Sequence, residues 1–205
     1  MVNAAINYFE YGQREIDYLT NADPVLGAAI ERLGKPEREI IPDLFTALVN
    51  AMVGQLISVK AADAIWGRML ERLGSMTPQR VAEQSVADIK GCGLSLKKAE
   101  NIHAIASSIM SGELNLHELT ALPDAEVAAK LTSLKGVGHW TAEMLLIHAL
   151  ERPDVVSWGD AAIRRGMMRL YGLSELTKQQ FEEYRKLYSP YGSVASIYLW
   201  QLSAD

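Results

Sequence analysis

Two features in the third quarter of the chain have residue types and spacing suited to chemistry on a phosphate-bearing molecule. Gly136 and Gly138 flank Val137 in a predicted tight turn, where glycine permits a positive φ and a close approach of backbone N–H groups to another molecule. A helix predicted over about residues 139–150 follows, and its first N–H groups and its dipole favour a bound phosphate. About 20 residues later, Asp160 begins a second predicted helix and supplies a carboxylate. The pattern indicates phosphate contact combined with a chemical role for Asp160.

Each of these features also has an ordinary structural explanation. A Gly-x-Gly sequence before a helix is usually only a turn. An aspartate after a glycine at a helix start is commonly an N-cap, whose carboxylate accepts hydrogen bonds from the first backbone N–H groups. The combination at this spacing is more specific than either half.

The segment LKGVGHWTA (residues 134–142), followed at this distance by Asp160, resembles the helix-hairpin-helix and Gly/Pro-Asp signature of the base-excision DNA glycosylases, the HhH-GPD superfamily. The resemblance covers about residues 22–202 and implies that Asp160 is the catalytic residue. It implies that the hairpin grips the DNA backbone through Gly136, Val137, Gly138, His139 and the N–H group of Trp140. It also implies a monovalent cation, Na⁺ or K⁺, on the backbone carbonyls of Thr132, Leu134 and Val137.

Trp140 narrows the chemistry that the resemblance implies. In the lyase branches of this superfamily, a lysine at the corresponding hairpin position attacks the sugar and forms a Schiff base, which an indole cannot do. The chain is therefore most similar to the monofunctional alkylation-repair branch, 3-methyladenine DNA glycosylase II, and no lyase activity is expected. Trp200 matches a second aromatic residue of that branch, which lines the base pocket. For both tryptophans, packing in the hydrophobic core is the alternative explanation.

The two tryptophans and the lone carboxylate suggest a substrate class. A positively charged, N-alkylated base over an indole gains about 0.5–2 kcal/mol from cation–π attraction. Such a base needs no protonation to leave, so Asp160 alone can stabilise the positive charge that develops on the sugar or orient the attacking water. Met144 and Ala161 stand where the branch has pocket tyrosines, which predicts a roomier or less aromatic pocket.

A second loop resembles the part of this family that wedges into the duplex. An enzyme that acts on a base in a duplex must extrude the base and fill the gap. In the sequence VGQLIS (residues 53–58), Gln55 and Leu56 lie between two predicted helices, and Ser58 completes the family's Gly-Gln-x-x-Ser pattern. The alternative is that Leu56 belongs to the core and Gln55 is a polar loop residue. Lys97 and Lys98 are further candidates for DNA contact, with a solvated charge pair as their alternative.

Composition limits the remaining classes. The chain has 205 residues, of which 49% are hydrophobic, enough for one or two small domains. The single cysteine, Cys92, excludes an internal disulfide and a four-cysteine zinc or iron–sulfur site, and the four histidines do not form a helical metal-binding pair. No apolar run is long enough to span a membrane, and the acidic N-terminus does not resemble a signal peptide. We expect a protein of the cytoplasm, associated with the nucleoid, or of the nucleus if the source is eukaryotic.

The formal net charge of −5 is the strongest argument against a DNA partner. The charge is unevenly distributed, however. Residues 1–50 carry eight acidic and four basic residues, whereas residues 130–170 carry six basic and four acidic ones. A hairpin that binds phosphate through N–H groups also needs fewer cations than a basic groove does.

Apolar residues recur at helical spacing through nearly the whole chain, and no stretch alternates convincingly as a strand, so we predict an all-α fold. The expected helices span residues 3–19, 23–33, 42–54, 58–73, 78–83, 85–90, 95–110, 123–133, 139–150, 160–170, 177–188 and 191–202. By resemblance, residues 38–150 form a central helical barrel that ends in the hairpin. Residues 1–37 and 151–205 form a second lobe that carries Asp160, with the active-site cleft between the lobes.

The sequence thus predicts a monomeric, monofunctional DNA glycosylase that flips and hydrolytically excises alkylated purines, such as 3-methyladenine and 7-methylguanine, from double-stranded DNA in base-excision repair. Three alternatives remain open. One is a bifunctional glycosylase, or one for oxidised or deaminated bases, and another is a DNA-binding hairpin module without activity. The third is a helical scaffold with an accidental motif match, which only the net negative charge supports.

Overall fold

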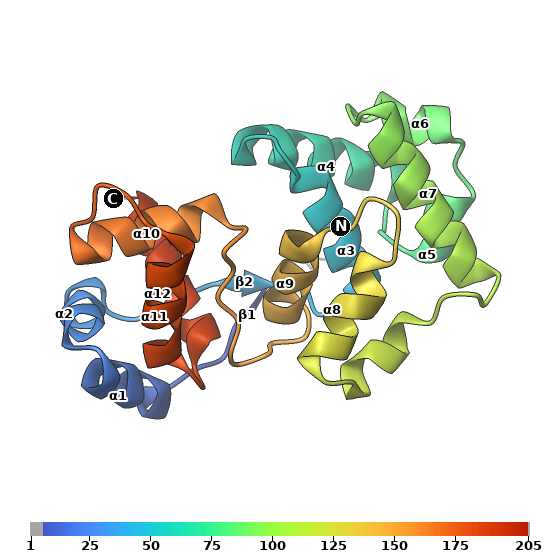
Figure 1. Ribbon diagram of the computed structural model, residues 1–205. Helices are drawn as coiled ribbons and strands as arrows, with labels where there is room; N and C mark the ends of the chain where they lie inside the picture. Colours follow the sequence, from blue (N-terminus) through green and yellow to red (C-terminus); the bar gives the residue numbers. More distant parts are fainter. Residues whose placement is uncertain (1–5, 205) are drawn as a thin grey trace. The chain divides into compact units, whose positions relative to one another are not determined.

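The computed structural model describes residues 6–204, which are predominantly helical (Figure 1). The chain divides into two compact units, of which unit 1 comprises residues 1–40 and 146–205 and unit 2 comprises residues 41–145. Among the described residues, no helix combines the length and the apolar character needed to cross a bilayer.

Unit 2 is a group of short helices, most of which begin at a side-chain cap. Its helices are α3 (Leu44–Gly54), α4 (Val59–Leu73), α5 (Pro78–Ala82), α6 (Val86–Gly91), α7 (Leu96–Met110), the 3₁₀ helix η1 (Leu116–Ala121), α8 (Asp124–Thr132) and most of α9 (His139–His148). The caps that accept a hydrogen bond from a backbone N–H group two or three residues ahead are Asp43, Ser58, Thr77, Ser85, Ser95 and Asn115. These caps satisfy N–H groups that have no partner within their own helix, which is why the sequence locates the helix starts so well.

Helix α7 is central to the packing of unit 2, because it contacts α3, α5 and α6. Its apolar face buries Ala99, Ile102 and Ala106 completely. Val81 of α5 and Leu48 of α3 are equally buried. Burial of such side chains contributes roughly 1.5–3 kcal/mol each for the larger ones and holds these helices together.

Unit 1 contains the helices at both ends of the described chain. They are α1 (Gln13–Ala22), α2 (Pro24–Leu33), α10 (Ala161–Tyr171), α11 (Lys178–Tyr188) and α12 (Gly192–Ala204). Their core includes fully buried Leu19, Leu26, Phe181 and Tyr198. A buried polar network joins α10 to the start of α2, because the Tyr171 hydroxyl donates to Asp23 Oδ2 at 2.5 Å.

The crossing of α10 and α12 depends on a glycine. A Cβ atom at Gly166 would lie 1.9 Å from the carbonyl oxygen of Leu199, so only glycine lets the two backbones approach this closely. Asp160 immediately precedes α10, and Trp200 follows Leu199 in α12. The crossing therefore fixes the separation of the two elements that carry these candidate site residues.

The expected helix over residues 3–19 is wrong in its first part. Residues 3–5 lie outside the described residues, and Asn7–Tyr8 form strand β1, which pairs antiparallel with strand β2 (Glu39–Ile40). The pairing continues at Phe9, whose N–H group donates to the Arg38 carbonyl at 2.8 Å. This long-range pairing overrides the local helical pattern, and α1 begins only after Gly12.

The other expected helices correspond to observed ones, with ends that differ by at most a few residues. The helix η1 was not predicted. The lobe boundaries were expected after residues 37 and 150. The boundaries between the two units fall after residues 40 and 145, three and five residues away.

Candidate active site

Asp160 lies at the N-terminus of α10 and is nearly buried, with 8% of its surface exposed. Its Oδ1 atom accepts hydrogen bonds from the N–H groups of Ala162 at 2.8 Å and Ile163 at 2.9 Å. The N-cap explanation of this residue is therefore correct as a description of its local structure. The same two bonds and the helix dipole also hold a negative charge in one orientation, which is what electrostatic catalysis needs.

The loop before Asp160 is tied to α12 by two serines that have no exposed surface. Ser193 Oγ accepts from the Val155 N–H group at 3.0 Å and donates to the Arg152 carbonyl at 2.5 Å. Ser196 Oγ donates to the Val155 carbonyl at 2.8 Å. Because a buried hydrogen-bonded loop has few alternative conformations, Asp160 is presented rigidly.

Trp200 is packed against two side chains that the sequence analysis did not identify as site residues. The ring of His148, at the end of α9, stacks on the indole with a centroid distance of 5.4 Å and an interplanar angle of 25°. The guanidinium carbon of Arg38 lies 4.2 Å from the indole centroid. Trp200 remains partly exposed, so it is not simply a core residue.

The charges of this cluster are coupled to Asp160. Burial and the neighbouring Arg38 cation lower the pKa of His148 to about 4, against the opposing effect of Asp160, so the imidazole is neutral at physiological pH. Burial also lowers the pKa of Arg38, while the negative charges of Asp160 and Glu39 act in the opposite direction. Unit 1 thus brings together a carboxylate, a cation, a neutral imidazole and an indole.

The hairpin of unit 2 joins α8 to α9 through a turn at Gly136. This residue has a φ of +85°, and a Cβ atom there would lie 2.3 Å from Asn101 Nδ2. Gly138 differs from the expectation, because it does not adopt a positive φ. A Cβ atom at Gly138 would meet no atom within 4 Å. The absence of a side chain at Gly138 therefore leaves open space in front of the start of α9.

The loop at residues 55–58, between α3 and α4, supports the hairpin and presents a strained, exposed tip. Gln55 Nε2 donates to the Gly136 carbonyl and to Thr141 Oγ1, both at 2.9 Å. Leu56 is fully exposed, at 105% relative accessibility, and has a φ of +59°, which is uncommon for a non-glycine residue. Leu56 is therefore not a core residue, whereas Gln55 is held against the hairpin.

The two lysines considered for DNA contact differ. Lys97 is exposed. Lys98 Nζ donates to the carbonyls of Val53 at 2.9 Å and Gln55 at 2.7 Å, at the C-terminal end of α3, and burial lowers its pKa. Lys98 therefore stabilises the end of this helix and the loop that follows it, as cations near helix C-termini do.

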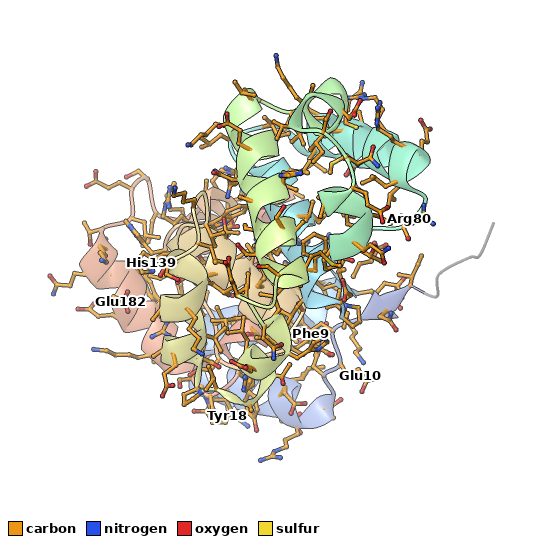
Figure 2. The ribbon with its side chains drawn as sticks, turned by 90° about the vertical axis from the view of Figure 1, so that its right-hand side faces the viewer. Phe9, Glu10, Tyr18, Arg80, His139 and Glu182 are labelled. Atoms are coloured by element: carbon orange, nitrogen blue, oxygen red, sulfur yellow. The ribbon has the colours of Figure 1, made fainter. Side chains whose placement is uncertain are left out.

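The remaining predicted site residues lie as follows. Ser58 caps α4, and His139 is exposed at the start of α9 (Figure 2). Trp140, in the first turn of α9, is half-buried, whereas Met144 is buried one turn later. Ala161 is exposed at the start of α10. Because Trp140 and Trp200 belong to different units, their pairing around a base stays a prediction.

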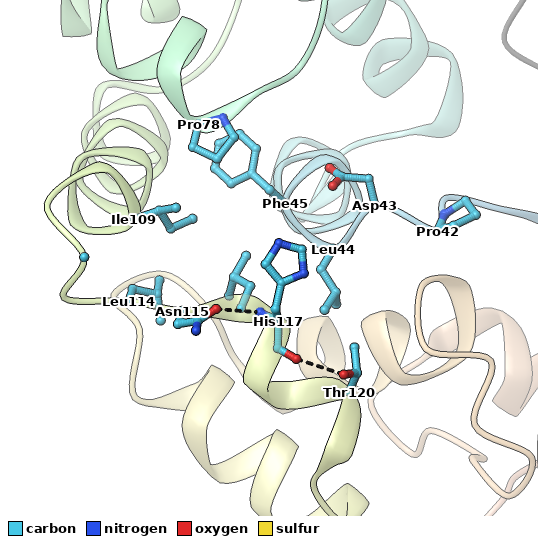
Figure 3. Close-up of a pocket in the computed structure, with 12 residues that line it drawn as sticks. Pro42, Asp43, Leu44, Phe45, Pro78, Ile109, Leu114, Asn115, His117 and Thr120 are labelled. Atoms are coloured by element: carbon cyan, nitrogen blue, oxygen red, sulfur yellow. Dashed lines mark hydrogen bonds between the residues drawn. The ribbon is translucent and has the colours of Figure 1, made fainter.

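Two further observations concern ligand binding. Among residues 6–204, no group of three or more His, Cys, Asp or Glu side chains is placed to hold a metal ion. Unit 2 has a hollow of about 410 Å³ at the starts of α3 and η1, with the His117 side chain in its wall (Figure 3). None of the candidate site residues lines this hollow, so it is separate from the candidate active site.

A predominantly helical fold with a glycine hairpin in front of one helix and a buried aspartate at the start of another defines the helix-hairpin-helix DNA glycosylase class. A family model described as HhH-GPD superfamily base excision DNA repair protein matches residues 49–190. This match covers more than half of the chain. The chain belongs to the HhH-GPD superfamily.

Individual relatives are similar over most of the chain. DNA-3-methyladenine glycosylase 1 of Schizosaccharomyces pombe is 32% identical over 164 residues, which are 78% of this chain and 72% of that protein. A DNA-3-methyladenine glycosidase structure from Bacillus halodurans has a TM-score of 0.80 and 35% identity, and the match covers 96% of this chain and 92% of that one. A 3-methyladenine DNA glycosylase of S. pombe in complex with abasic DNA has a TM-score of 0.84 and 29% identity, with 92% and 96% covered.

Proposed function

We propose that this protein is a monofunctional DNA N-glycosylase that excises alkylated purines in base-excision repair. The observation that carries the proposal is the buried, doubly hydrogen-bonded carboxylate of Asp160 at the start of α10, in a chain of the HhH-GPD superfamily. Relatives named DNA-3-methyladenine glycosylase support the substrate class. DNA is the partner that the family implies.

In the proposed reaction, Asp160 stabilises the positive charge that develops on the deoxyribose as the N-glycosidic bond breaks. Water then attacks C1′, and the products are the free base and an abasic site. The two N–H donors hold Oδ1 in one fixed orientation, so we assign Asp160 mainly an electrostatic role and only secondarily the role of base. An alkylated purine that already carries a positive charge leaves without an acid catalyst.

The DNA-binding roles are divided between the hairpin and the tip of the second loop. We propose that the N–H groups in front of α9 bind a phosphate and that Leu56 enters the base stack when a nucleotide is extruded. Full exposure of Leu56 and the open space at Gly138 support these roles. Gln55 acts on the DNA through the hairpin that it supports, not as the wedge.

A monovalent cation on the carbonyls of Thr132, Leu134 and Val137 remains part of the proposal. The Leu134 carbonyl accepts one hydrogen bond, from the Val137 N–H group at 3.1 Å, and a carbonyl oxygen has a second lone pair to offer a cation. Such a cation would brace the hairpin against a phosphate. We propose no zinc or iron–sulfur cofactor, and we expect the protein to act as a monomer on damaged chromosomal DNA.

The alternatives make different predictions. A non-catalytic hairpin module would bind duplex DNA and leave alkylated bases in place. A bifunctional glycosylase for oxidised bases would cut the strand through a Schiff base, for which Trp140 offers no amine. Solved 8-oxoguanine glycosylase/lyase neighbours share the fold with this chain at 19% identity, which supports only the fold.

The test compares the wild-type protein with Asp160→Asn on methylated duplex DNA. Asparagine is also a good N-cap, so the variant should keep the start of α10 and its thermal unfolding temperature within a few degrees. We expect the wild type to release 3-methyladenine or 7-methylguanine and Asp160→Asn to be slower by at least about 100-fold. Released bases are measured by chromatography, and strand breaks are measured before and after alkali.

The outcomes separate the candidate functions. Base release by the wild type with breaks only after alkali supports a monofunctional glycosylase. A covalent complex trapped by borohydride would contradict the monofunctional mechanism. Equal DNA binding by both proteins with no base release would favour the non-catalytic module.

A further inference from the structure

Arg38 and His148 form a cluster with Trp200 in unit 1, and the proposed mechanism uses neither Arg38 nor His148. Arg38 comes directly before β2, and its carbonyl is held by the Phe9 N–H group at 2.8 Å. Its guanidinium lies 4.2 Å from the centre of the Trp200 ring, and its Nη2 atom lies 3.4 Å from His148 Nε2. The backbone of Arg38 is thus held by the strand pair, and its guanidinium lies against the rings of Trp200 and His148.

The distances place Arg38 and His148 on the same face of the indole. Groups on opposite faces of a ring would be separated by two contact distances, or about 7 Å. The 3.4 Å between Arg38 Nη2 and His148 Nε2 is far shorter than this separation. One face of Trp200 is therefore covered by the protein itself, and a base that stacks on Trp200 must use what remains exposed.

The covered face also carries a permanent positive charge. Arginine stays protonated in proteins, whereas His148 is neutral at physiological pH. The guanidinium of Arg38 already makes the cation–π interaction that the indole of Trp200 can offer. A positively charged base on the other face would gain less from the ring and would be repelled by Arg38 across it.

We propose that Arg38 is a specificity-determining residue that reduces the preference for cationic over neutral purine bases. The inference rests on the proposed function, because it takes Trp200 as a wall of the base pocket. A neutral base keeps its stacking and dispersion contacts with Trp200 and experiences no repulsion from the guanidinium. When it leaves, it takes up the proton that the attacking water releases. Arg38 thus shifts the balance between the two classes of base without contacting the bond that breaks.

The test measures single-turnover excision of 7-methylguanine, a cationic base, and hypoxanthine, a neutral one, from otherwise identical duplexes. The reported quantity is the ratio of the two rates on one protein preparation, which does not depend on the folded fraction. We expect the wild type to excise both bases. Arg38→Met, which keeps the length and removes the charge, should raise the ratio of 7-methylguanine to hypoxanthine rates about tenfold.

Two further variants serve as controls. Arg38→Lys keeps a positive charge that can lie over the indole and should leave the ratio within about threefold of the wild type. Lys35→Met removes a cation that lies over another ring of unit 1, 5.0 Å from the centre of Tyr11, and should leave the ratio unchanged. Lys35→Met therefore corrects for the general loss of one positive charge in DNA binding.

An unchanged ratio in Arg38→Met, or excision of 7-methylguanine alone by the wild type, would overturn the inference and leave the proposed glycosylase activity intact. Equal slowing of both rates in Arg38→Met would assign Arg38 a structural role and would also overturn it. If the wild type releases neither base, the proposed function itself is wrong, and the inference is wrong with it.

Discussion

At the scale of single residues, the chemical role that we propose for Asp160 coincides with a structural role. Its Oδ1 atom caps α10, and the carboxylate is held in one orientation by the two N–H groups it satisfies. The same bonds that stabilise the helix therefore preorganise the charge. Activity and stability of Asp160 variants should separate only where the replacement can still cap the helix, as asparagine can.

His148 predicts a pH dependence of stability. Its pKa is about 4 in the folded protein against an ordinary value of 6.5, so the unfolded chain binds the proton more readily. Its contribution to stability is fully present above pH 6.5 and is lost as the pH falls from 6.5 to 4, by at most roughly 3 kcal/mol. Urea unfolding of the wild type and of His148→Phe at pH 7.5 and 4.5 measures this contribution.

Phenylalanine keeps a ring against Trp200 but cannot titrate, so the free energy of unfolding of His148→Phe should fall less between these two pH values. Parallel pH dependences in the two proteins would show that His148 is not protonated on unfolding in this range.

At the scale of elements, the α10–α12 crossing links Asp160 to Trp200. Gly166→Ala would place a methyl group against the Leu199 carbonyl and force the helices apart. We expect a loss of about 3 kcal/mol or more in the free energy of unfolding, together with slower base release. Gly67→Ala is the matched control, because Gly67 lies inside α4 with nothing within 4 Å of the added Cβ.

Alanine at Gly67 should stabilise the protein by up to about 1 kcal/mol, since it favours the helix over glycine. Chemical denaturation of the wild type, Gly166→Ala and Gly67→Ala measures their free energies of unfolding. Similar stabilities for Gly166→Ala and the wild type would mean that the two backbones do not meet as described.

The hairpin offers a second pair of glycine variants with different expected effects. Gly136→Ala meets both a positive φ and the side-chain amide of Asn101, and should lower the free energy of unfolding by about 2 kcal/mol. Gly138→Ala has open space and no positive φ, so its stability should change by less than about 0.5 kcal/mol. The affinity of Gly138→Ala for duplex DNA should nevertheless fall about tenfold, because the added methyl group obstructs the approach of a phosphate.

Thermal unfolding and fluorescence anisotropy with a labelled duplex measure the two effects. Unimpaired DNA binding by Gly138→Ala would contradict the proposal that the hairpin contacts DNA.

The elements were largely predictable because their signals are local. Thr77-Pro78 and Asp23-Pro24 combine a cap with a proline at the first helical position, and the helices begin there. Strand β1 was not predictable, since two residues carry no periodicity and their partner lies more than 30 residues away. The same reason hid Arg38 and His148 from the sequence analysis, because 110 residues separate them and only the fold makes them neighbours.

At the scale of the whole molecule, a net charge of −5 favours a DNA interface in which few cations contact phosphates. In our proposal the hairpin binds phosphate through backbone N–H groups, and Lys98 is already engaged by two carbonyls. We therefore predict a shallow salt dependence of DNA affinity, with a slope of log K against log salt between about −2 and −4. Anisotropy titrations from 50 to about 200 mM salt measure the slope, and a value near −8 would indicate an extensive basic interface.

If Leu56 enters the base stack as we propose, its fully exposed, positive-φ conformation has a consequence for how lesions are found. A wedge that is already extended in the free protein needs no triggering step, so it would press on every base step that the protein visits. The time spent at each step would then be set by the resistance of the DNA to unstacking. A damaged purine, which stacks or pairs less firmly than its neighbours, would delay the protein longest. Lesion search would in this way be timed by the local mechanics of the duplex before any base reaches the pocket.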